Sequence, residues 1–331
     1  MNAIARRTRV LAACAAVALL TTVLPPATEA QDLENWQRDE LRGLLDAINA
    51  AVEGEIVPDT DPFELRPDFL KGTDGNAYVP FTLSIDPAKV DSPMVSMYLF
   101  VAEPGDENAV FEDAYFASVE PSGDGLIRIS RAFTAPGGPY DVYVAIQQSM
   151  GEESDEDERG PVMLLRQRVD VPDLWDGRLQ LSTIILPEVV EPLAAPLTPD
   201  EQILSPYSLG ATRIIPKFDE EFAKQAELSL IFLVYNPGLA DGSKPDITIE
   251  YTFHVRASGG EEYFNRTNPQ QFNGQTLPPA FDVTLGHQIV AGQTVPLSLF
   301  PAGDYRLEIK VTDNTNSAEI IESVMFTVLE T

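Results

Sequence analysis

The feature that most constrains the fold is a short phrase that occurs twice, as PGGPYDVYVAI (136–146) and PAGDYRLEIKV (301–311). Both copies read Pro-x-Gly-x-Tyr and continue into residues of period two. In the second copy, apolar side chains from Tyr305 to Val311 alternate with Arg, Glu and Lys. Such alternation indicates a strand with one face on a core and the other in water.

Tyr140 and Tyr305 follow a Pro-Gly turn at the start of these two strands. This arrangement resembles the tyrosine corner of immunoglobulin-like and fibronectin-like sandwiches. There the hydroxyl bonds back to the backbone a few residues upstream, and the ring lies in the core. The resemblance implies an all-β fold, with two immunoglobulin- or fibronectin-III-like β-sandwiches in tandem.

A second correspondence supports the duplication. YVPFTLSIDP (78–87) and LSLIFLVYNP (228–237) each read as a strand that ends in Asp-Pro or Asn-Pro. We therefore predict one sandwich over 63–172, a hinge over 173–178 and a second sandwich over 179–331, which includes a Pro-rich extended segment at 186–216. Because the strand after Leu228 is apolar on both sides, we expect the Pro-rich segment or the first domain to cover it.

The N-terminus predicts a signal and a helix. Residues 1–30 carry a basic start, an apolar stretch and small residues before a cleavage site after Ala30, which is typical of a secretory signal peptide. Over 31–55, Leu41, Leu44, Ile48 and Val52 recur at helical spacing. This amphipathic helix either docks on the first sandwich or pairs with another chain.

Composition limits the partners. Without the signal, the chain keeps 19 basic and 51 acidic side chains, a net charge of −32. Such a field repels nucleic acid and anionic membrane surfaces. The one cysteine leaves with the signal, and no later stretch is long and apolar enough for a membrane span. We expect an exported bacterial protein, periplasmic or extracellular, that folds without disulfides.

The sequence contains few residues in patterns suited to catalysis or metal binding. The two histidines are His254, on the polar side of its strand with Thr252 and Arg256, and His287 in a loop. Without a third His or a Cys, neither a zinc site nor a catalytic triad is favoured, and we expect no catalytic, cofactor or metal residues. The acidic run GEESDEDERG (151–160) is interpreted as a solvated hairpin tip. It lacks the D-x-D-x-D-G order of a calcium loop, so Ca²⁺ remains only an alternative there.

Aromatic residues of the first sandwich could form a glycan-binding face. Tyr143 lies on the outward side of its strand. Other aromatic residues on predicted strands of this domain are Tyr98, Phe100, Tyr115 and Phe116. The competing interpretation is packing in a core or between domains.

Three stretches carry a resemblance to a family: YVPFTLSIDPAKVD, KPDITIEYTFHV and LFPAGDYRLEIKVTDNTN. They resemble the tandem β-sandwich C-terminal region of acidobacterial-type secreted proteins that carry a von Willebrand factor A-related or GWxTD domain. The helix DELRGLLDAINAAVEGE resembles the helix that precedes those sandwiches. The chain has neither the A-type domain, nor a D-x-S-x-S metal motif, nor G-W-x-T-D, so the resemblance implies only the sandwich pair.

We therefore expect a non-enzymatic binding or scaffolding protein of the cell envelope or exterior. Its partner would be a protein or another envelope component. The alternatives are a carbohydrate-binding accessory protein and an unrecognised carboxylate-dependent hydrolase. The sequence leaves the ligand, the oligomeric state and the role of the helix open.

Overall fold

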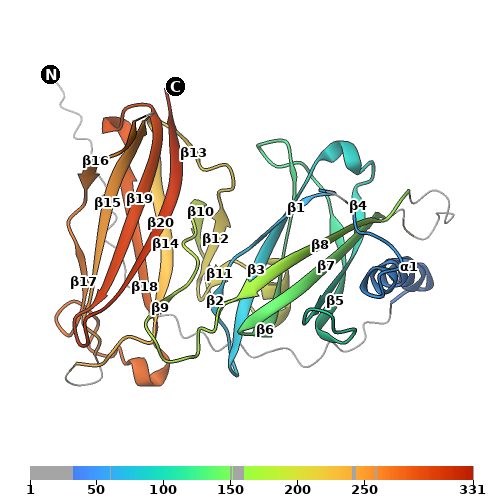
Figure 1. The fold of residues 1–331 in the computed structure, drawn as a ribbon, viewed down its shortest axis with the longest axis horizontal. Coiled ribbons are helices and arrows are strands. Elements are labelled where there is room, and N and C mark those ends of the chain that lie inside the picture. Colours follow the sequence, from blue (N-terminus) through green and yellow to red (C-terminus); the bar gives the residue numbers. More distant parts are fainter. Residues whose placement is uncertain are drawn as a thin grey trace. The chain divides into compact units, whose positions relative to one another are not determined.

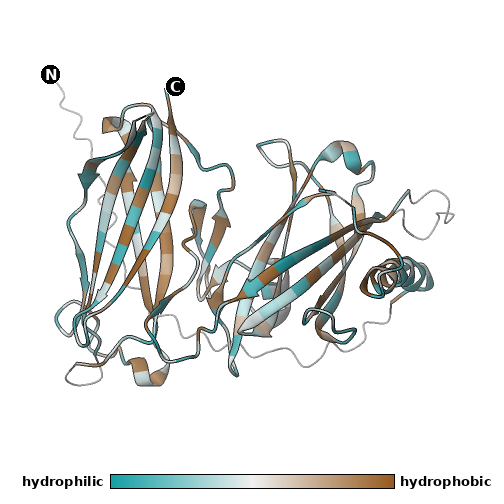
Figure 2. Ribbon diagram, in the orientation of Figure 1, coloured by the Kyte–Doolittle hydropathy of each residue, from teal (hydrophilic) through white to brown (hydrophobic). Residues whose placement is uncertain are grey.

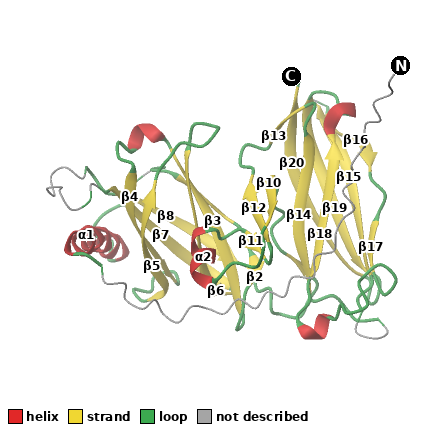
Figure 3. Cartoon of the chain, turned by 180° about the vertical axis from the view of Figure 1, so that it is seen from behind, coloured by secondary structure: helices red, strands yellow, loops and turns green. Residues whose placement is uncertain are grey.

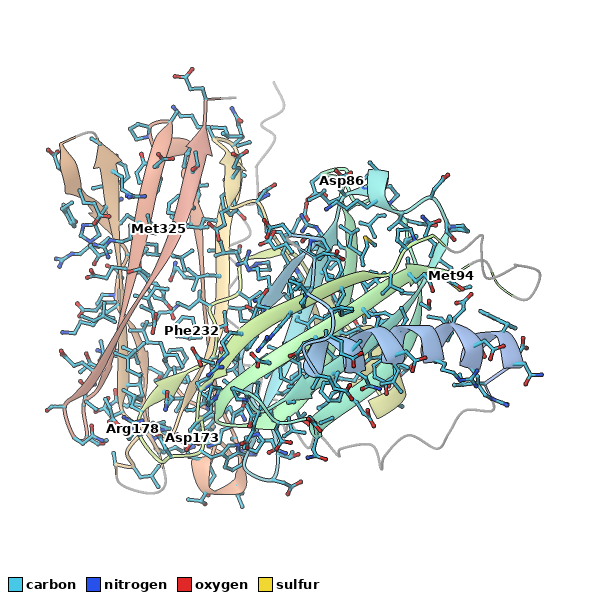
Figure 4. The ribbon with its side chains drawn as sticks, turned by 45° about the vertical axis from the view of Figure 1, so that its right-hand side comes forward. Asp86, Met94, Asp173, Arg178, Phe232 and Met325 are labelled. Atoms are coloured by element: carbon cyan, nitrogen blue, oxygen red, sulfur yellow. The ribbon has the colours of Figure 1, made fainter. Side chains whose placement is uncertain are left out.

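The structure is a computed structural model that describes residues 33–59, 61–149, 151, 160–240, 244–257 and 259–330. The predicted signal peptide lies outside these ranges. The described residues form two compact units. The first contains 33–176 and 194–208, and the second contains 177–193 and 209–330. The first crossing between the units falls inside the predicted hinge, between Asp173 and Arg178, which are both labelled in Figure 4.

The first unit consists of two antiparallel sheets, a long helix and a short one (Figure 1). In the β3 sheet, β1 and β2 pair with one edge of β3 and β6 pairs with the other; the β7 sheet has the order β5-β4-β7-β8. The elements are α1 (Asn35–Val52), β1 (Glu64–Pro67), β2 (Leu70–Lys71), β3 (Asn76–Ile85), β4 (Met94–Ala102), β5 (Ala109–Ser118), β6 (Ile127–Pro136), β7 (Gly138–Gln148), β8 (Met163–Val171) and α2 (Pro199–Leu204), with a 3-10 turn at Pro87–Lys89.

One apolar core joins the two sheets of this unit. Val79, Phe81 and Leu83 on β3 and Val142 and Val144 on β7 are fully buried in the same cluster. These residues alternate along their strands, as the period-two pattern predicts.

Helix α1 covers the outer face of the β7 sheet. A capping box between Glu34 and Gln37 begins the helix. Leu44 and Ile48, one turn apart, are both 0 % exposed and pack with Phe100 of β4 in a second apolar cluster. The expectation that the predicted helix docks on the first sandwich, rather than pairing with another chain, agrees with this packing.

A segment from beyond the hinge belongs to the first unit. We call 194–208 the returning segment; it contains α2, which lies beside β6 (Figure 3). The Tyr207 hydroxyl donates to the Asp68 carboxylate at 2.7 Å, and the Tyr78 hydroxyl donates to the Pro206 carbonyl at 3.1 Å. The structure thus differs from the sequence-based division, which placed all of 186–216 in the second sandwich. The difference comes from these long-range contacts, which no local pattern encodes.

The second unit contains two larger sheets. The β14 sheet has the order β18-β14-β9, and the β19 sheet has the order β13-β20-β19-β15-β16, with β17 also on β15. A small sheet has the order β10-β12-β11. The strands are β9 (Gln180–Leu181), β10 (Pro187–Pro192), β11 (Ser208–Leu209), β12 (Thr212–Pro216), β13 (Glu221–Ala223), β14 (Glu227–Tyr235), β15 (Ile247–Ala257), β16 (Gly260–Arg266), β17 (Gln270–Phe272), β18 (Ile289–Pro296), β19 (Gly303–Asp313) and β20 (Ala318–Leu329), with 3-10 turns at Val283–Leu285 and Leu297–Leu299.

The main sheets of the two units share one strand order. If β1 and β2 count as one strand, β16 and β17 count as one strand, and β13 is set aside, the first, second and fifth strands form one sheet in each unit. The fourth, third, sixth and seventh form the other, in that order. The duplicated phrase opens the sixth strand each time, β7 and β19.

Strand β14 is buried on both faces. Leu228 and Phe232 point into the core of the second unit, at 0 % and 1 % exposed. Leu233 and Tyr235, on the opposite face, are each 2 % exposed. The apolar character on both sides of this strand therefore corresponds to burial on both sides.

Candidate functional site

The two predicted corner tyrosines bond back to their own turns. The Tyr140 hydroxyl donates to the Pro136 carbonyl at 3.0 Å, and the Tyr305 hydroxyl donates to the Pro301 carbonyl at 2.7 Å. Burial raises the pKa of both phenols. Their rings lie in the two cores, so these residues hold the fold together and offer no surface to a ligand.

Close packing requires a glycine at Gly137 in the first corner. Gly137 stands at the variable position of the Pro-x-Gly-x-Tyr phrase, where the second copy has Ala302. A Cβ on Gly137 would come within 2.7 Å of the Cα of Asp173, so the chain approaches too closely for any other residue. The first bend is thus packed against the start of the predicted hinge.

Tyr143 is not a ligand-facing residue. It lies on the outward side of β7, as predicted, but α1 covers that side and leaves the ring 4 % exposed. The ring meets Phe100 edge to face at a centroid distance of 6.1 Å, and the Arg166 guanidinium lies 5.5 Å from its centroid. The other aromatic residues proposed for a glycan face pack in the same cluster or in the main core: Tyr98, Phe100, Tyr115 and Phe116.

The candidate calcium loop falls outside the described residues for 152–159. Within the described ranges, no group of three or more His, Cys, Asp or Glu side chains is arranged to hold a metal ion.

Three buried acids have structural partners instead. The Asp68 carboxylate accepts from Tyr207, and the Asp141 carboxylate accepts from Arg166 at 2.8 Å. Asp313, which is 0 % exposed, accepts from the backbone N–H of Gly238 at 2.6 Å and so fastens a loop to the end of β19.

The outer face of the β19 sheet presents a broad set of polar side chains. On β19 and β15, buried apolar residues alternate with exposed or half-exposed polar ones, and Figure 2 shows this as alternating bands. The side chains of this outer face are Thr252, His254, Arg256, Glu261, Tyr263, Arg306, Glu308, Lys310, Glu319, Ile321, Ser323 and Met325.

Ion pairs order the centre of this face. The Arg306 guanidinium contacts the carboxylates of Glu261 at 2.8 Å and Glu308 at 3.0 Å, and it also donates to the Ser323 hydroxyl. The hydrogen bond to Glu261 raises the pKa of Arg306 further. Lys310 pairs with Glu319 at 2.6 Å. Such linked charges hold long side chains in place on a surface where single ion pairs contribute little.

Two exposed side chains on the face are suited to contact with a partner. Tyr263 is 61 % exposed, and Ile321 is 57 % exposed. The face therefore combines an ordered charge lattice with exposed aromatic and aliphatic groups.

The outer faces of the other main sheets are closed, at least in part. Helix α1 covers the β7 sheet. On the β3 sheet, the outward residues Thr82 and Ser84 are 0 % and 8 % exposed. Leu233 and Tyr235 are buried on the β14 sheet. The sequence indicated the polar side of β15 and β19, but it could not show that the other sheets lack such a face.

Comparison with models of known protein families and with curated proteins finds no match to this chain. Among the described residues, neither helix has an apolar stretch of the length that a membrane crossing needs. The geometry of the surface is therefore the basis for a functional interpretation.

Proposed function

We propose that the protein is an exported, non-enzymatic binding or scaffolding protein of the cell envelope or exterior. It contacts its partner through the outer face of the β19 sheet. The partner is a protein or another envelope component.

The proposal includes an immunoglobulin- or fibronectin-III-like sandwich for each unit. Its support is the strand order that both units share and the tyrosine hydrogen bond at the start of each sixth strand. Sandwiches of this kind commonly act as recognition modules, but fold alone does not give function. The argument for binding therefore depends on the surface.

One observation carries the functional proposal. The outer face of the β19 sheet keeps exposed aromatic and apolar groups within an ordered charge lattice, while α1 or other chain segments bury residues on the outer faces of the other main sheets. Exposed aromatic residues among charges that are already positioned are typical of protein-binding surfaces, where Tyr and Arg are enriched.

Site-specific photocrosslinking in the native host tests the proposal. A photoreactive amino acid is placed at Tyr263, on the edge strand β16 of the face, and in a matched variant at Leu299, which is 84 % exposed elsewhere in the same unit. We expect a discrete crosslinked species from position 263 and none from position 299. Tyr263→Ala combined with Arg306→Ala should also abolish a crosslink placed at Thr252. Equal crosslinking at 263 and 299, or none at 263, would refute the use of this face.

Neither alternative function gains a specific observation. The aromatic residues assigned to a glycan face are packed under α1 or in the core. The buried acids Asp68, Asp141 and Asp313 accept hydrogen bonds from partners that hold the fold together.

A further inference from the structure

Along most of the β20 edge of the β19 sheet, no other strand of the described residues pairs with β20. β20 pairs with β19 from Ala318 to Val328. On its other edge, the only strand of the described residues that pairs with it is β13, which reaches Thr327 to Leu329 (Figure 1). The stretch 318–326 therefore has a paired edge and an unpaired edge.

The backbone geometry identifies which groups point outward. The Thr327 N–H donates to the Glu220 carbonyl at 3.0 Å on the β13 side, away from β19. Because backbone groups alternate in direction along an antiparallel strand, every second residue before Thr327 also presents its N–H and C=O to the open edge. These residues are Glu319, Ile321, Ser323 and Met325 (Met325 is labelled in Figure 4).

The segment that precedes β13 does not run along this edge. Glu220 has a φ of +52°, a left-handed conformation that a residue other than glycine adopts at a cost. This bend directs the chain into β13, so the parallel pairing starts only at Thr327. The stretch 318–326 is thus unpaired because the chain bends sharply at Glu220, and not because the end of the chain frays.

Two other edges of the main sheets carry blocking groups among the described residues. On β8, the Asp59 N–H donates to the Leu164 carbonyl, and the Leu164 N–H donates to the Asp59 carboxylate, both at 2.9 Å. On β18, the Gln270 side-chain amide donates to the Gly292 carbonyl at 2.7 Å. Proteins commonly protect sheet edges in such ways, because an open edge accepts a further strand.

We propose that the 318–326 edge of β20 accepts an extended segment of a partner protein, in which apolar residues alternate with basic ones. Backbone hydrogen bonds to Glu319, Ile321, Ser323 and Met325 would supply the pairing. The apolar side chains of the segment would pack beside Ile321 and Met325 on the outer face, and its basic side chains would meet the exposed Glu322 on the opposite face.

The charge argues against a second copy of this chain as the occupant. A second copy would bring another net charge of −30 to the same edge, together with its own Glu319 and Glu322. Like charges opposed across neighbouring strands are destabilising. A basic strand removes this repulsion and is attracted by the field of the whole chain.

Amide hydrogen exchange, followed by NMR on the full mature chain, tests both the edge and its occupant. In the free protein we expect fast exchange at Ile321, Ser323 and Met325 and slow exchange at Glu322 and Val324, which bond to β19. The probe is an acetylated and amidated octapeptide of alternating Val and Lys. It should bind and slow the three fast amides at least tenfold.

Three controls separate strand addition from non-specific attraction. The same peptide with N-methyl groups along its pairing edge, and a Val–Glu octapeptide, should each bind at least tenfold more weakly. Ile321→Lys should abolish protection, whereas Leu299→Lys, the same charge change at another exposed apolar residue, should preserve it.

Three results would overturn the proposal. The first is slow exchange at these amides in the free monomer, and the second is protection that grows with protein concentration alone. The third is equal binding of the peptide with and without N-methyl groups. The proposal stands independently of the photocrosslink at Tyr263, which reports on the outer face and not on the edge.

Discussion

The hydrogen bond between Tyr207 and Asp68 should be a main support of the first unit. Tyr207 is 3 % exposed and Asp68 is 4 % exposed, with 2.7 Å between the phenol oxygen and the carboxylate. A hydrogen bond to a charged group contributes about 1.5–3 kcal/mol, and its loss here leaves a carboxylate with little access to water. We therefore expect Tyr207→Phe to lower the free energy of unfolding of the first unit by about 2 kcal/mol at pH 7.

The loss should depend on pH. Burial raises the pKa of Asp68 above its usual value, and the bond from Tyr207 acts in the opposite direction. Because the folded-state pKa is raised, the folded protein binds this proton more tightly, and its stability falls as the pH rises from the unfolded-state pKa through the folded-state pKa. Removing the Tyr207 hydroxyl raises the folded-state pKa of Asp68 further and so widens the pH range over which stability falls. The difference between variant and wild type should thus be larger at pH 7 than at pH 4.

Urea unfolding followed by tryptophan fluorescence measures this effect, because both tryptophans, Trp36 and Trp175, lie in the first unit. Tyr98→Phe is a matched control: it removes a 3.0 Å tyrosine–carboxylate bond at a partly exposed site, with an expected loss of about 0.5 kcal/mol. Asp68→Asn should remove most of the pH dependence of the Tyr207→Phe loss. Equal losses for Tyr207→Phe and Tyr98→Phe, or a Tyr207→Phe loss that grows on acidification, would refute the reasoning.

Three further predictions concern stability. Tyr140→Phe and Tyr305→Phe should each destabilise their own unit by about 0.5–1.5 kcal/mol, seen as a shift of one calorimetric transition; no shift for either would contradict the structural role of the corner. Ile48→Ala, at 0 % exposure on the buried side of α1, should cost about 2–5 kcal/mol in urea unfolding by tryptophan fluorescence, and a loss below 1 kcal/mol would mean that α1 is loosely docked. The Lys244 ammonium donates to three backbone carbonyls within 278–281, at 2.5–3.0 Å. Lys244→Met should therefore lower the calorimetric transition of the second unit by about 1–2 kcal/mol, and an unchanged transition would argue against this anchor.

Local sequence patterns predicted those parts of the fold whose cause is local. The alternation after Tyr305 specified which side of β19 enters the core, since successive side chains in a strand point to opposite faces. The spacing of Leu41, Leu44 and Ile48 specified the buried stripe of α1 in the same way. The repeated Pro-x-Gly-x-Tyr phrase located two equivalent bends, because the bond from each tyrosine reaches back only four residues.

Only the tertiary structure decided what covers each apolar or polar face. The outward position of Tyr143 was correct, but a helix about a hundred residues earlier in the chain buries its ring. Asp68 and Tyr207 are 139 residues apart, and no local sequence pattern around either residue predicts their contact. The open edge at β20 likewise depends on where β13 begins to pair. Periodicity records the direction of a side chain relative to its own strand or helix, whereas its exposure depends on distant segments that pack against that face.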